Sequence, residues 1–303
     1  MGRPSGDPEG ITLGMSLKGR RGAGRDMAAQ LTLAGPVEIA GVGLHTGEPC
    51  AVTLLPCDGP YGIMFLLGAD GEVRVPATVE QVVSSERYTA LGTGEHQVRT
   101  VEHLLAALTA MGVCHARVRV RGPEIPAMDG SALPFAEAIE QAQTRPLEAP
   151  EPPPLRLPVR VAAEGAHIRA APAGALRVTC TVEYPYVGEQ TATFEITPQV
   201  FKREIAPART FGFEHEVSAL LAGGLAAGAS EENAVVVGPA GYSSPLRFED
   251  ELVRHKILDL LGDLALVGVP FTAEIVAVRP GHALNAELAR ALRAQLAGPR
   301  LGP

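Results

Sequence analysis

The composition of the chain excludes several classes of protein. Its 303 residues are 46% hydrophobic and 20% charged, and the formal net charge is −8 at pH 7. These values are typical of a soluble globular protein with room for two domains. The acidic balance argues against nucleic-acid binding, which needs a basic face. Because no apolar run reaches the roughly 18 residues of a transmembrane helix, we expect no stable membrane insertion.

The cysteines indicate the compartment. All 4 are widely scattered, and none forms a Cys-x-x-Cys pair. They are most simply free thiols of a reducing environment, so we expect a cytoplasmic protein.

The N-terminal segment 1–28 differs from the rest of the chain. It combines glycines with basic residues and holds no apolar core long enough for a secretory signal. We expect a disordered extension, or a true start codon at Met15 or Met27. An organelle-targeting peptide is the less favoured alternative, because the segment also contains acidic residues.

The first half of the chain is expected to be rich in strands. Short alternating runs between Gly and Pro turns predict strands at 37–39, 51–55 and 117–120. A segment with helical apolar spacing, 101–108, lies just before the last of these strands. The proline-rich stretch 147–154 cannot continue a helix or a central strand, and we interpret it as an interdomain linker.

The second half repeats this scheme. Strands are predicted at 177–183, 191–196, 234–238 and 273–278, with a helical segment over 253–264 and a last helix over 283–296. Strands followed by a helix and another strand in each half indicate a duplicated α+β domain. We expect the first domain at 29–146 and the second at 155–303, with a ligand site where the two meet.

The helical segments 101–108 and 253–264 each carry a histidine two places after a valine. His255 and Asp259 are four residues apart, so they share one face of the second helix. Imidazole and carboxylate together form the ligand set of a catalytic zinc or non-haem iron, with His103 of the first helix as the third ligand. The alternative is that both helices expose ordinary solvated polar faces. The recurrence of the pattern favours a metal-dependent enzyme.

Several other residues have side chains suited to catalysis. Glu102 lies outside the apolar stripe of its predicted helix, as do His103, Ala106 and Ala107. We expect the two small alanine side chains to leave room for metal and substrate. A carboxylate at such a place can take a proton from the attacking water, although it can equally be a surface glutamate. His282, at a strand-to-helix turn, can be a general acid or a simple cap.

Two further residues fit the same chemistry. Asp263 lies on the ligand side of the second helix and can hold His282 protonated. Thr210, in a turn before a helix, can donate a hydrogen bond to an oxyanion, although this turn alone is an ordinary loop.

Six segments carry a resemblance to a known family. They are GVGLHTG (41–47), TVEHLLAAL (100–108), EIPAMDGSALPF (124–135), ARTFGF (208–213), LRFEDELVRHKILDLLGDL (246–264) and GHALN (281–285). In order, and from about residue 30 to 296, the chain resembles the zinc-dependent UDP-3-O-acyl-N-acetylglucosamine deacetylases, which perform the committed step of lipid A synthesis.

This resemblance implies a fold and a set of roles. The fold would be two α+β domains packed with their helices between the sheets and the metal at the interface. His103, His255 and Asp259 would be the zinc ligands. The roles of the other side chains would be general base for Glu102, electrostatic stabiliser or general acid for His282, orientation of His282 for Asp263, and oxyanion binding for Thr210.

The resemblance also implies how the substrate binds. Lys256 would lie near the diphosphate of the nucleotide-sugar acyl substrate, and Phe211 would line the passage for the acyl chain. Arg279 stands where a lysine is common and would keep the charge near the phosphates. The segment 63–67 lacks the charged residues that the resemblance leads us to expect there. We expect a monomer, with Zn²⁺ as the cofactor and Fe²⁺ as its alternative in the cell.

Two rival functions use the same residues. A different metallo-hydrolase or a non-haem iron oxygenase would share the His/His/Asp set, and oxygen dependence would identify the oxygenase. A non-catalytic binding protein would have lost Glu102 or a ligand, and here all are present.

Overall fold

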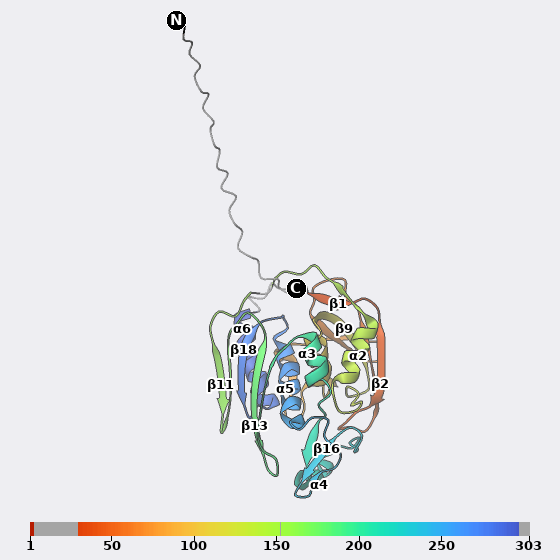
Figure 1. Cartoon of the computed structure of the whole chain (residues 1–303). Coiled ribbons are helices and arrows are strands. Elements are labelled where there is room, and N and C mark those ends of the chain that lie inside the picture. Colours follow the sequence, from red (N-terminus) through yellow and green to blue (C-terminus); the bar gives the residue numbers. More distant parts are fainter. Residues whose placement is uncertain (3–29, 152, 297–303) are drawn as a thin grey trace.

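The computed structural model describes residues 1–2, 30–151 and 153–296, and it is an α+β protein, as predicted (Figure 1). Residues 3–28 of the predicted extension and one residue of the predicted linker lie outside the described residues. The division into two domains at 147–154 stays a prediction. Among the described residues, no helix is both long and apolar enough to cross a membrane.

The first sheet is 7-stranded and is built around β9 (Val113–Arg121). Its path runs β10-β1-β9-β3-β2, while β4 pairs with β9 and β5 pairs with β4. The other strands are β1 (Leu31–Leu33), β2 (Val37–Val42), β3 (Pro49–Leu55), β4 (Ile63–Leu67), β5 (Val73–Pro76) and β10 (Thr144–Pro146). Along β9, Val118 and Val120 are buried while Arg117 and Arg119 are not, so one face of this strand packs on the core.

The second sheet is 5-stranded, in the order β11-β12-β18-β13-β14. Its strands are β11 (Val159–Ala163), β12 (Ala166–Pro172), β13 (Arg177–Tyr184), β14 (Gly188–Glu195) and β18 (Ala273–Val278). Only β13 and β18 pair in parallel among them. The predicted strands at 177–183, 191–196 and 273–278 are therefore confirmed, with shifts of a few residues at the ends.

The main helices lie between the two sheets, as the resemblance implied (Figure 1). They are α1 (Glu102–Ala110), α2 (Leu133–Ala142), α5 (Glu251–Leu264) and α6 (His282–Leu296). Helix α1 packs on β9 and α2 on β2, whereas α5 packs on β13 and β14, and α6 on β11 and β12. Since α1 also packs along α5, the two histidine helices meet at the centre of the molecule.

Two small 3-stranded sheets extend this framework. One contains β6 (Val82–Ser84), β7 (Ala90–Thr93) and β8 (His96–Val98). The other contains β15 (Phe211–Phe213), β16 (Val235–Gly238) and β17 (Gly241–Tyr242), and α4 (Glu214–Ala222) follows β15. Along the chain between β14 and β15, α3 (Pro198–Val200) leads into a π-helical turn at Phe201–Ile205.

The interior around α1 and α5 is closely packed. Ala106 and Ala107 are completely buried, and the room that we expect them to leave for metal and substrate stays a prediction. Helix α5 is likewise buried on nearly its whole circumference. Small side chains here allow the helices to pack closely, because a narrow side chain lets two backbones approach.

Candidate metal centre

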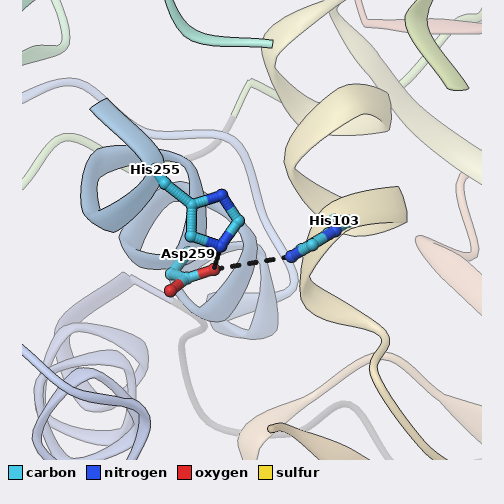
Figure 2. Close-up of side chains that lie close together, drawn as sticks. All are labelled: His103, His255 and Asp259. Atoms are coloured by element: carbon cyan, nitrogen blue, oxygen red, sulfur yellow. Dashed lines mark ion pairs between the residues drawn. The ribbon is translucent and has the colours of Figure 1, made fainter. Parts of the chain in front are cut away.

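The three predicted ligands converge between α1 and α5 (Figure 2). His103 projects from the first turn of α1, and His255 and Asp259 project one turn apart from α5. The candidate ligand atoms of these three side chains all lie within 4.8 Å of one another. All three residues are at most 6% exposed. Their burial excludes the alternative of solvated polar faces.

One oxygen of Asp259 faces both imidazoles. Oδ1 lies 3.4 Å from Nε2 of His255 and 3.7 Å from Nε2 of His103. The rings of the two histidines meet edge to face, with their centroids 5.0 Å apart. The other oxygen, Oδ2, accepts a hydrogen bond from the Lys256 ammonium at 2.7 Å. The atoms available to a shared metal ion are therefore Oδ1 and the two Nε2 atoms.

The protonation of these groups suits metal binding. Nδ1 of His255 lies 3.0 Å from the carbonyl oxygen of Ala208, and a proton donated there leaves Nε2 with a free lone pair. Burial and the neighbouring His255 lower the pKa of His103 to about 3, so its imidazole is neutral. Burial alone would raise the pKa of Asp259, but Lys256 and the histidines hold it well below its usual range. Neutral imidazoles and an ionised carboxylate form the donor set of a zinc ion.

Glu102 lies directly beside this cluster. It is 3% exposed, and one carboxylate oxygen accepts a hydrogen bond from the backbone N–H of Thr89 at 3.1 Å. Burial raises the pKa of Glu102 to about 8, with His282 opposing and Asp263 adding to the shift. A carboxyl group whose pKa lies near the working pH can exchange a proton with the reaction in both directions.

His282 and Asp263 form a buried pair on the other side. Nδ1 of His282 lies 2.9 Å from Oδ2 of Asp263, and Nε2 lies 4.0 Å from Oδ2 of Asp259. Although burial alone would lower the pKa of His282, Asp263 raises it to about 9. The imidazolium is therefore the neutral-pH form, and Nε2–H is turned toward the cluster. The geometry agrees with the predicted pairing of these two residues.

The segment 208–213 is fixed by a buried ion pair. Arg209, 7% exposed at its side chain, donates to both oxygens of Glu251, whose side chain is fully buried at the start of α5. This pair holds the Ala208 carbonyl against His255. The next residue, Thr210, donates its backbone N–H to Gly130 at 2.8 Å.

Phe211 lies beside the cluster. Its ring centroid is 6.0 Å from that of His255 and 5.3 Å from that of Tyr184. Phe213 completes this aromatic group, 5.3 Å from Tyr184. The group provides an apolar wall next to one candidate ligand.

Two predicted substrate contacts are engaged elsewhere. The Lys256 ammonium is paired with Asp259, and the exposed guanidinium of Arg279 is paired with Glu183. The predicted contact of these two cations with a diphosphate stays a prediction. Arg279 also has a φ of 50°, so the backbone is left-handed where β18 gives way to α6.

Sequence reasoning overlooked several buried polar residues. Glu124, fully buried, accepts hydrogen bonds from the backbone of His45 and Thr46 and from Oγ1 of Thr100. It thereby holds the 41–47 loop and the turn before α1, where Thr100 has the strained φ of 57°.

Some of these residues could have been found from the sequence, and others could not. Glu124, Glu251 and Asn285 fall within the segments that carry the family resemblance. Thr89 falls in none of them, and only the structure relates it to Glu102 and Asp263.

The fold and the site define a class of protein. A buried His/His/Asp set beside a carboxylate and a His–Asp pair is the combination of side chains that a metal-dependent hydrolase uses. Residues 30–294 match the family model of UDP-3-O-acyl N-acetylglycosamine deacetylase, a family of metalloenzymes. The chain belongs to this family.

Curated relatives agree with this assignment. The chain is 45% identical over 271 residues to the UDP-3-O-acyl-N-acetylglucosamine deacetylase of Thermosynechococcus vestitus, covering 88% of this chain and 94% of the relative. It is 43% identical over 267 residues to the enzyme of the same name from Myxococcus xanthus, covering 86% and 85%. The enzyme of the same name from Anaeromyxobacter dehalogenans is 41% identical over 277 residues, with 90% of each covered.

Proposed function

We propose that this chain hydrolyses the acetamide of UDP-3-O-acyl-N-acetylglucosamine, giving UDP-3-O-acyl-glucosamine and acetate, in the biosynthesis of lipid A. The observation that carries the proposal is the buried cluster of His103, His255 and Asp259 beside Glu102, in a chain of the deacetylase family. Water adds to the amide carbonyl, the C–N bond breaks, and the sugar amine leaves with a proton.

The proposed cofactor is zinc, held by Nε2 of His103, Nε2 of His255 and Oδ1 of Asp259. A bound zinc ion polarises the amide carbonyl and brings the pKa of water down to about 7. Ferrous iron is the second candidate, because two imidazoles and a carboxylate suit both ions. The hydrogen bond from His255 to Ala208 supports the assignment, since a ligand histidine commonly uses its other nitrogen in this way.

We assign the remaining roles to four other side chains. Glu102, in its ionised form, takes the proton of the attacking water, since burial raises its pKa to about 8 and makes the carboxylate a stronger base than an ordinary glutamate. The imidazolium of His282 and the hydroxyl of Thr210 stabilise the negative charge on the tetrahedral carbon's oxygen. Asp263 keeps His282 oriented and charged. The proton that Glu102 has gained can then go to the departing amine.

The substrate is proposed to bind on both sides of the cluster. Phe211 and its aromatic neighbours supply an apolar wall for the acyl chain. Lys256 and Arg279 supply positive charge for the diphosphate, which requires each to exchange its present carboxylate partner for a phosphate oxygen. We place the reaction in the cytoplasm, because the free cysteines are typical of a reducing compartment. We expect the chain to act as a monomer.

The test is acetate release from UDP-3-O-acyl-N-acetylglucosamine by the purified full-length chain. The protein is assayed as isolated, after chelation, and after re-addition of zinc or ferrous iron. We expect chelation to abolish release and metal to restore it. The variant Asp259→Ala should bind no stoichiometric zinc. Metal-replete, folded protein that releases no acetate would disprove the proposed activity, and full metal retention by Asp259→Ala would remove this residue from the ligand set.

A further inference from the structure

Thr89 lies immediately before β7 and is 1% exposed. Its three polar groups all make long-range hydrogen bonds. The backbone N–H donates to Oε2 of Glu102 at 3.1 Å, and the backbone carbonyl accepts from the N–H of Val101 at 3.2 Å. The hydroxyl donates to Oδ1 of Asp263 at 2.5 Å. A single residue thus contacts the first turn of α1 and the last turns of α5.

These contacts join the two acid–base groups of the site. Glu102 belongs to α1, and Asp263, which holds His282, belongs to α5. The two helices pack directly against each other, and Thr89 adds one hydrogen bond to the carboxylate that each of them contributes to the site.

The hydroxyl determines how Asp263 is oriented. Oδ2 of Asp263 accepts from Nδ1 of His282 at 2.9 Å and from Nδ2 of Asn285 at 2.8 Å, both on α6. Among the described residues, Thr89 is the hydrogen-bond partner of Oδ1. Without that bond, the carboxylate is held at one oxygen alone and can rotate about it. Rotation would change the direction in which His282 presents Nε2.

We propose that Thr89 is a positioning residue of the deacetylase site, fixing Glu102 through its backbone and the Asp263–His282 pair through its hydroxyl. This inference rests on the proposed function. A buried threonine needs a partner for its hydroxyl in any case, and a bond to a nearby carbonyl would satisfy it. Here the hydroxyl is committed to an anionic carboxylate that orients a second functional side chain, and such supporting contacts commonly set activity.

The test compares Thr89→Val, which keeps the shape and removes the hydroxyl, with Thr89→Ser, which keeps the hydroxyl. Thr93→Val, at the exposed end of β7, is the matched control. We expect Thr89→Val to lower kcat by about 10- to 100-fold with little change in KM or bound zinc. Thr89→Ser should restore most of the rate, and Thr93→Val should leave it unchanged. Equal losses in Thr89→Val and Thr89→Ser, or a Thr89→Val rate close to that of the unmodified chain, would overturn the proposal.

A second measurement does not depend on turnover. The Nδ1 proton of His282, hydrogen-bonded to Asp263, should give a low-field proton resonance that is assigned by its loss in His282→Ala. We expect this resonance to shift or broaden in Thr89→Val and to return in Thr89→Ser. An unchanged resonance in folded Thr89→Val would overturn the coupling. If the unmodified chain released no acetate, the proposed function would fail, while the resonance would still decide whether Thr89 holds the pair.

Discussion

Gly262 of α5 lies directly against the carbonyl oxygen of Glu102 on α1. A Cβ added at this glycine would overlap the backbone carbonyl, which cannot move aside as a flexible side chain can. The backbones of the two helices therefore lie in contact next to His103 and less than one turn after Asp259. The distance between ligands on different helices depends on the absence of a side chain at this position.

This contact predicts the effect of Gly262→Ala. The methyl group must push α1 and α5 apart, at a cost of about 1–3 kcal/mol in the free energy of unfolding. Because His103 moves away from His255 and Asp259, zinc affinity should fall as well. Urea unfolding and zinc titration measure the two effects. Gly174→Ala is the control, since a Cβ there meets open space. An unchanged unfolding midpoint and zinc affinity in Gly262→Ala would contradict the close packing.

Substitution of Glu102 separates proton transfer from metal binding. Glu102→Gln keeps the size of the side chain and removes its basicity, so kcat should fall by about 10²- to 10⁴-fold. Bound zinc should stay stoichiometric, because Glu102 is outside the ligand set. Metal content and acetate release are measured on one preparation. Glu137→Gln, exposed on α2, should behave as the unmodified chain. Undiminished turnover in Glu102→Gln would remove its role as base.

Local patterns in the sequence were sufficient to predict α1, α5 and several strands. The i, i+4 spacing placed His255 and Asp259 on one face, and alternation located β13 and β18. His103 is 152 residues from His255 along the chain. Only the recurrence of the pattern indicated that the two belong to one site. No local rule states that two such helices pack together.

What the sequence could not predict depends on long-range packing. The hydroxyl of Thr89 meets Asp263 across 174 residues, and Arg209 meets Glu251 across 42. A lone threonine before a short strand carries no periodic signal, so its partners are decided by how α1 and α5 dock. The short strands β6, β7 and β8, each at most four residues long, were likewise below the length at which alternation is informative.

His282→Ala tests whether this histidine stabilises charge or binds metal. Its Nε2 is 4.0 Å from the nearer oxygen of Asp259, and its Nδ1 is occupied by Asp263. Loss of a charged donor beside the oxyanion should lower kcat by about 10²- to 10³-fold. Zinc should remain bound. The exposed His96→Ala is the matched control. Loss of stoichiometric zinc from His282→Ala would instead make it a ligand.

The buried pair of Arg209 and Glu251 predicts a stability effect with a defined pH dependence. Burial alone would raise the pKa of Glu251, but hydrogen bonds from Arg209 and Arg247 hold it below its ordinary value of 4.5. A carboxylate with a lowered folded pKa stabilises the protein above its unfolded pKa, and this contribution is lost as the pH falls through the folded pKa. Glu251→Gln leaves Arg209 buried without its counter-charge, at a cost of about 3–5 kcal/mol at neutral pH.

Urea unfolding of the unmodified chain and of Glu251→Gln between neutral pH and pH 3 checks this prediction. The difference in unfolding free energy should be largest near pH 7. It should shrink as the pH falls below 4.5 and through the lowered pKa of Glu251, where the unmodified chain also becomes protonated at this residue. Zinc affinity should fall in the variant, because the pair holds the Ala208 carbonyl against His255. Glu249→Gln, exposed two residues earlier, should change stability by less than about 0.5 kcal/mol. A difference between the chains that does not shrink at any pH below 4.5 would show that the charge of Glu251 is not what stabilises this segment.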